Sequence, residues 1–185
     1  MWGSELPELV GTRLRLRMLT RADAQGILSV FGDPEVIRYW SSSQLKDLDE
    51  AGELIDRIHG LFERCELFQW GIHSRELGQI VGTCTLQHVD TTHKRAEVGI
   101  ALGSPSWGHG LGPEALGLLI DFVFDELELH RLEADVDPNN ARSIAMFERL
   151  GFQREGYLRE RWHLLGEIQD SVLFGLLKHE WRRTV

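Results

Sequence analysis

The segment from Trp107 to Pro113 has the residue types of an anion-binding loop, because glycine stands at positions 108, 110 and 112. Glycine leaves the backbone N–H groups uncovered, and Pro113 suits the first position of a helix, where its missing N–H costs nothing. A helix that begins here offers unpaired N–H groups and the positive end of its dipole to a phosphate. The spacing therefore predicts a cradle for a pyrophosphate group at the start of a helix.

The same loop permits a second interpretation. Gly110 to Ala115 fits GxGxxA, a pattern typical of dinucleotide-binding folds, and an acidic residue follows at roughly the right distance as Glu133 or Asp135. That pattern would indicate a nicotinamide-dependent dehydrogenase. It starts after residue 105, however, and leaves too little chain for the remaining parallel strands of such a fold. A glycine-rich turn without any ligand is the third interpretation, and the nucleotide-binding pattern GxxxxGK[ST] is absent from the sequence.

The segment 137–152 predicts a short helix with suitable residues at both ends. Asn139 and Asn140 are good helix N-caps, and Gly151 fits the position just after a helix. Phe147 and Phe152 have the spacing of the hydrophobic contact that accompanies a Schellman ending.

The remaining segments supply a sheet and further helices. Strict alternation in TRLRLRM predicts a half-exposed strand over 12–18, and Thr20 with Asp23 has the spacing of a capping box before a helix that ends at Gly32. Further expected elements are a helix at 48–62, strands at 67–73, 79–87 and 95–102, a helix at 113–127, a strand at 131–136, a helix at 140–150, and strands at 153–159 and 169–176. This order predicts one α/β (α+β) domain with an antiparallel meander and one parallel crossover through the helix at 113–127.

The amino-acid composition limits the classes of ligand and partner that the protein can bind. Among 185 residues, 20 Lys and Arg stand against 29 Asp and Glu, a net charge of −9, and no basic run is long enough to follow a phosphate backbone. We therefore expect no direct nucleic-acid binding, whereas the acidic balance suits cationic ligands.

Cys65 and Cys84 form no CxxC pair, and the histidines show no metal-ligand spacing, so no metal is expected. No segment approaches 18 consecutive apolar residues, so we expect no membrane association and a cytoplasmic location.

Two patterns together resemble the GNAT superfamily of acyl-CoA-dependent N-acetyltransferases. WGxGLGxEA begins at Trp107, and NxxSxxxFExLGF begins at Asn140, with a helix and a strand between them. The opening LVGTRLRLRMLTRADAQGILSVFGDPEVIRYW, the segment 96–100 and the closing strand around Asp170 are similar to the RimJ/RimL-type branch. The resemblance covers residues 10–180. It implies a single GNAT domain over 1–185 whose central sheet is mixed, mostly antiparallel, splayed and six- to seven-stranded, with flanking helices.

The resemblance also implies which residues bind acetyl-CoA. The backbone of the strand containing Val98, Ile100 and Leu102 would pair with the pantetheine arm, and Asn140 would lie beside the cofactor. Trp107 stands where the superfamily usually has Gln or Arg. The pyrophosphate would be bound by the loop of Gly108, His109, Gly110, Leu111, Gly112 and Pro113.

The chemistry requires a neutral amine. At pH 7 an α-amino group is neutral in about a tenth of molecules, whereas deprotonating a Lys-like amine costs roughly 4.6 kcal/mol. Glu97 and Asp135 are the two candidate bases, and the sequence does not choose between them. Some superfamily members have a Tyr, as proton donor to the leaving thiolate, where this chain has Phe147. Ser143 would take that role, or the thiolate would leave unassisted, in a direct transfer without an acyl-enzyme.

The resemblance to the RimJ/RimL-type branch is the basis for predicting which amine accepts the acetyl group. A peptide or protein N-terminal α-amine is the first expectation, and a small cationic amine such as an aminoglycoside or polyamine is the alternative. A non-catalytic acyl-CoA-binding module is a further alternative, because of the missing Tyr. The acceptor site would be lined by 33–62 and 157–170, and the protein would be a monomer or a homodimer.

Overall fold

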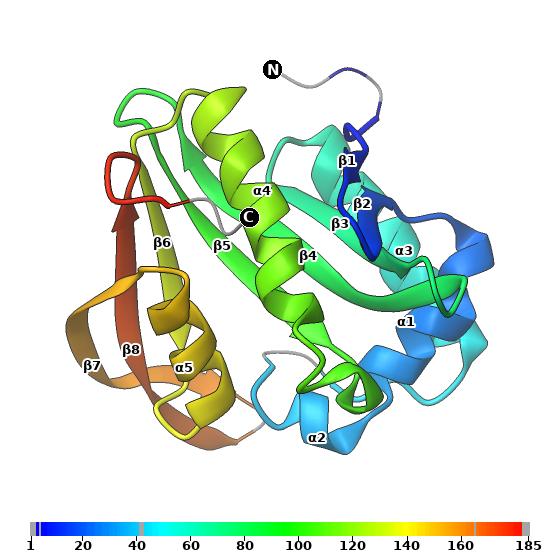
Figure 1. Cartoon of the computed structure of the whole chain (residues 1–185). Coiled ribbons are helices and arrows are strands. Elements are labelled where there is room, and N and C mark those ends of the chain that lie inside the picture. Colours follow the sequence, from blue (N-terminus) through cyan, green and yellow to red (C-terminus); the bar gives the residue numbers. More distant parts are fainter. Residues whose placement is uncertain (1–2, 4, 41–42, 165, 183–185) are drawn as a thin grey trace.

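The computed structural model describes residues 3, 5–40, 43–164 and 166–182, and within them eight strands form one sheet (Figure 1). The sheet order is β1-β2-β3-β4-β5-β6-β8-β7. The strands are β1 (Leu9–Val10), β2 (Leu14–Met18), β3 (Leu67–Ser74), β4 (Gln79–Asp90), β5 (Arg95–Leu102), β6 (Arg131–Val136), β7 (Gln153–Leu164) and β8 (Glu167–Leu177). The expected mixed, mostly antiparallel sheet is confirmed, with one strand more than the upper expectation because two-residue β1 pairs with β2.

The described part of the chain has five helices. They are α1 (Ala24–Phe31), α2 (Pro34–Ile37), α3 (Leu48–Glu63), α4 (Leu111–Asp125) and α5 (Ala141–Arg149), with 3₁₀ turns at Arg21–Asp23 and Ser104–Ser106. The Thr20–Asp23 capping box is present, and Asp33 caps the unexpected α2 by accepting from the N–H of Glu35. In the described part of the chain, no helix is long and apolar enough to cross a membrane.

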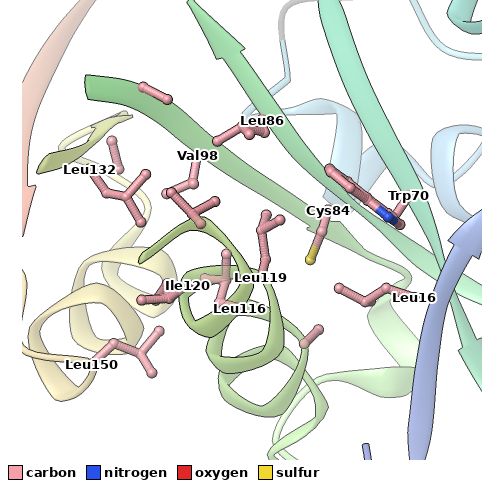
Figure 2. Packing of buried hydrophobic residues seen from close by; sticks show 14 of the residues in the cluster. Leu16, Trp70, Cys84, Leu86, Val98, Leu116, Leu119, Ile120, Leu132 and Leu150 are labelled. Atoms are coloured by element: carbon pink, nitrogen blue, oxygen red, sulfur yellow. The ribbon is translucent and has the colours of Figure 1, made fainter. Parts of the chain in front are cut away.

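Helices cover both faces of the sheet, and α4 lies along one of them (Figure 1). Leucine and isoleucine side chains of α4 pack against the strands beneath it, as Figure 2 shows. The residues in this contact include Leu116, Leu119 and Ile120 of α4 with Leu86, Val98 and Leu132 of the sheet. A second cluster, which includes Ile27 of α1, Ile55 of α3 and Ala101 of β5, forms the core on the other face.

The centre of the sheet splays open between β5 and β6. β3, β4 and β5 form the expected antiparallel meander, and β5 then pairs with β6 in parallel. That parallel pairing covers only Arg95 to Glu97 against Arg131 to Glu133. Beyond Glu97, β5 keeps its pairing with β4 while β6 continues along β8, so the facing edges of the two strands separate. The predicted gap is therefore present.

Candidate active site

The glycine loop lies at the start of α4 and next to the open end of β5. Gly108 and Gly110 have φ of 79° and 76°, a backbone conformation that side chains with a Cβ rarely adopt. Gly110 is the N-cap, and α4 begins at Leu111, so Pro113 lies in the first turn and not at the first helical position as expected. The orphan N–H groups of this turn are the donors that the cradle requires.

Gly112 permits close packing under the loop. A Cβ at this position would lie 2.9 Å from Sδ of Met146 and 3.2 Å from Cδ1 of Leu102. A side chain here would require the ends of the Met146 and Leu102 side chains to shift, so glycine suits this close approach. The conformation and packing of the loop fit the pyrophosphate group of acetyl-CoA.

Trp107 connects the loop to the edge of the gap. Its Nε1 donates to the carbonyl oxygen of Leu102, at 2.8 Å, and the Arg142 guanidinium of α5 lies over its ring, 4.4 Å from the centroid. Val98 and Ile100 precede Leu102 along β5, and all three lie beyond Glu97, the last residue of β5 that pairs with β6. Their pairing with a pantetheine arm stays a prediction.

The first turn of α5 contains Asn140 and Ser143. Oδ1 of Asn140 accepts from the N–H of Ser143 at 3.1 Å, so Asn140 is an N-cap as expected. Phe147 is 3% exposed and packs against Phe152, with ring centroids 5.1 Å apart. Because that ring belongs to the core, Ser143, which is only half-buried, is the available hydroxyl on this helix.

Replacing Ser143 with alanine should lower kcat by about tenfold while changing the Kd of acetyl-CoA by less than about twofold. The reason is that a proton donor to the leaving thiolate acts in the transition state and not in the bound ground state. Ser143→Cys, which keeps an acidic proton, should retain more activity than Ser143→Ala. Steady-state kinetics and calorimetric titration separate the two quantities. A loss confined to Kd would make Ser143 a binding residue only.

Glu97 and Asp135 face the same side of the sheet, opposite α4. They alternate with Ala96 and Ala134, whose side chains belong to the core under α4. Glu97 is 25% exposed and accepts from Nε2 of Gln87 at 2.7 Å, while its other oxygen lies 3.1 Å from Nδ1 of the exposed His88. Glu97 therefore keeps access to solvent at the edge of the gap.

The Asp135 carboxylate interacts with three side chains and is less exposed than Glu97. The buried Ser171 hydroxyl donates to one carboxylate oxygen, and Trp162 Nε1 donates to the other at 3.2 Å. Arg161 Nε lies 3.8 Å away as an ion-pair partner, and the side chain is only 13% exposed. Asp135 is therefore more enclosed by protein groups than Glu97, whose side chain is 25% exposed. Sequence analysis did not indicate Ser171, Trp162 or Arg161 as partners of Asp135.

The fold excludes the dinucleotide interpretation. Within the described residues the sheet has a single parallel pair, β5 with β6, whereas a dinucleotide-binding fold is built on a mostly parallel sheet. Glu133, which could have bound a ribose, instead accepts from Arg131 Nε at 2.8 Å and from Arg95 at 3.3 Å.

The cysteines are unsuited to a covalent intermediate. Cys84 is fully buried beneath α4 (Figure 2), and burial raises the pKa of its thiol. Cys65 is exposed beyond the end of α3, far along the chain from the loop. Among the residues that the structure describes, no group of His, Cys, Asp or Glu could hold a metal ion.

A polar cavity of about 420 Å³ lies at the start of α5. Its lining combines the end of α2, the loop before α5 and the β7–β8 hairpin: Arg38, Tyr39, Asp137, Pro138, Asn139, Tyr157, Glu167, Ile168, Gln169 and Asp170. Both segments expected to line the acceptor site, 33–62 and 157–170, contribute to this wall, although positions 41–42 and 165 are outside the described residues.

A tyrosine–aspartate pair forms part of the cavity wall. The Tyr157 hydroxyl donates to Asp170, whose other oxygen accepts from the N–H of Glu160 at 2.7 Å. These donors lower the pKa of Asp170, and the carboxylate in turn raises the pKa of Tyr157. Asp170 is therefore an anion near neutral pH.

Comparison with known proteins identifies the family. The family model described as "Acetyltransferase (GNAT) domain" matches residues 13–153, which include the glycine loop, the splayed strands and α5. The chain belongs to the GNAT acetyltransferase family. Like other GNAT enzymes, it is an acetyl-CoA-dependent N-acetyltransferase.

Individual GNAT relatives differ in what they act on. The chain is 36% identical to the uncharacterized N-acetyltransferase p20 of Bacillus licheniformis, over 91% of this chain and 95% of that protein. It is 27% identical to spermidine N(1)-acetyltransferase of Escherichia coli, over 91% and 88%. It shares the fold of ribosomal-protein-S5-alanine acetyltransferase from Vibrio fischeri, with 20% identity, a TM-score of 0.79, and coverage of 95% and 99%.

Proposed function

We propose that this single GNAT domain, residues 1–185, acetylates a small amine that carries more than one positive charge, such as a polyamine or an aminoglycoside. The observation that supports it is the charge of the cavity beside α5. Three carboxylates, from Asp137, Glu167 and Asp170, face one guanidinium, from Arg38. Together with a net charge of −9, this arrangement favours the approach and binding of a cation. The relationship to a spermidine acetyltransferase supports the same class.

The proposed reaction assigns roles to residues at both ends of the gap. The neutral acceptor nitrogen attacks the thioester carbonyl carbon, a C–N bond forms, and the C–S bond breaks. Glu97 accepts the proton that the amine loses. The Ser143 hydroxyl passes a proton to the departing thiolate and takes up another from solvent, so the serine is unchanged at the end of the reaction. Loop residues 108–113 bind the pyrophosphate, and β5 from Val98 to Leu102 lies along the pantetheine arm. No acyl-enzyme is formed.

The peptide α-amine expected from the RimJ/RimL-like sequence is the second candidate. Tyr157 and Ile168 line the cavity and are 54% and 60% exposed, so a peptide side chain would find an apolar surface at the entrance. An α-amine also needs less help from a base, because its pKa of about 7.7–8.0 leaves part of it neutral at pH 7.

The test measures release of CoA thiol from acetyl-CoA with spermidine, an aminoglycoside and short peptides with free N-termini, with products identified by mass. We expect turnover with the polycations. Glu167→Gln should raise the KM of the polycation by about threefold, a value typical of an exposed charge, without changing the KM of acetyl-CoA. Turnover confined to peptide α-amines would replace the first proposal with the second. Binding of acetyl-CoA without turnover of any of these acceptors would overturn both acceptor proposals.

A further inference from the structure

Arg13, the residue just before β2, reaches across to the glycine loop. Its Nη1 donates to the carbonyl oxygen of His109 at 2.7 Å, and its Nη2 donates to that of Gly110 at 3.1 Å. Its Nε donates to Oε2 of Glu114 at 2.7 Å, and its backbone N–H donates to Oε1 of the same carboxylate at 2.8 Å. Four hydrogen bonds thus join the first long strand to the loop and to the first turn of α4.

These bonds determine which way the loop amides face. In a trans peptide unit the C=O and N–H point in opposite directions. Because Arg13 binds the carbonyls of His109 and Gly110, the N–H groups of Gly110 and Leu111 point away from it. A guanidinium suits this task, since its planar fork can bind several acceptors at once.

The same side chain balances a charge that would oppose an anion. Glu114 lies in the first turn of α4, at the positive end of the helix dipole. Its carboxylate and a phosphate bound there would compete for the same positive potential. The ion pair with Arg13 neutralises that carboxylate and holds it on the Arg13 side of the turn.

We propose that Arg13 is a positioning residue for the pyrophosphate of acetyl-CoA: it orients the loop amides and neutralises Glu114 without touching the cofactor. This proposal rests on the assignment of loop 108–113 as the pyrophosphate cradle. It gives a binding role to a residue about a hundred positions away from that loop in the sequence.

The test measures the Kd of CoA by calorimetric titration, with no acceptor present. Arg13→Ala should raise the Kd by about tenfold, the size expected for losing charge-assisted hydrogen bonds in a partly exposed position. Arg15→Ala is the matched control, because Arg15 lies two residues further along and its guanidinium pairs with Glu8, at 3.2 Å, and not with the loop. The control should leave the Kd unchanged, and thermal unfolding should show that both variants are folded.

A double variant separates positioning from general damage. In Arg13→Ala the Glu114 carboxylate is left unneutralised, so adding Glu114→Gln should recover about threefold of the lost affinity. If the double variant binds CoA no better than Arg13→Ala, the electrostatic part of the proposal is wrong. If Arg13→Ala binds like the wild type while Gly110→Val does not bind, the cradle stands and the role of Arg13 is wrong. If both bind like the wild type, the cradle itself is wrong.

Discussion

Replacing Gly110 with valine is expected to abolish measurable acetyl-CoA binding while the domain stays folded. Gly110 has a φ of 76°, and a Cβ there would lie 3.3 Å from Nη2 of Arg13. Valine would be strained by about 1–3 kcal/mol in this conformation, and relieving that strain rotates the peptide whose N–H faces the anion. We expect the Kd of acetyl-CoA, measured by calorimetric titration, to rise by about 100-fold or more, because several backbone donors lose their alignment together.

Gly78 provides the matched control for this experiment. It lies in the turn between β3 and β4 with a φ of 64°, and a Cβ there would meet nothing within 4 Å. Gly78→Val therefore introduces similar backbone strain away from the loop. We expect a comparable fall in Tm and an unchanged Kd. A Gly110→Val variant that binds acetyl-CoA within about threefold of the wild type would refute the cradle.

The elements with strong local patterns were predictable. The ends of α5 follow from its own residues: Asn140 caps the start, and at the end the N–H groups of Gly151 and Phe152 bond back to Glu148 and Phe147 as in a Schellman motif. β5 and β6 lie over the residues expected from their hydrophobic pattern. The four-residue α2 and two-residue β1 escaped prediction because neither is long enough to show a period.

The closing strands show where a pattern breaks. β7 was expected to end at residue 159 but continues to Leu164. Its register against β8 shifts between Leu158 and Trp162, and Glu160 has a φ of 54°. A bulge of this kind interrupts the alternation of side chains, which is the signal that sequence analysis follows.

The parts of the site that depend on neighbouring residues in the sequence were predictable. The contacts between residues far apart in the sequence were not. Capping and glycine chemistry indicated the loop at 108–113 and the helix at 140–150. The bonds that join distant residues left no such signal: Arg13 to Glu114 spans 101 positions and Ser171 to Asp135 spans 36. A single sequence shows residue types but not which of them meet, so it left Glu97 and Asp135 as equal candidates for the base.

Glu97→Gln is expected to lower kcat for a polyamine acceptor by about 100-fold at pH 7. Glutamine keeps the size of the side chain and its oxygen for the Gln87 bond, but it cannot take up the proton of the amine. As the pH rises towards the pKa of the amine, near 10.4 for a Lys-like group, more of the acceptor is already neutral. The difference between wild type and variant should therefore shrink with increasing pH. With a peptide α-amine the loss at pH 7 should be much smaller.

Glu133→Gln is the control for a general effect of charge on this face of the sheet. Glu133 is the parallel partner of Glu97 in the β5–β6 register and is bound by Arg95 and Arg131. Its removal changes the net charge as much as Glu97→Gln does, yet it takes no proton in the proposed reaction, so kcat should stay within about twofold of the wild type. Equal losses in the two variants, or a Glu97→Gln deficit that does not change with pH, would show that Glu97 acts through the local potential and not as the base.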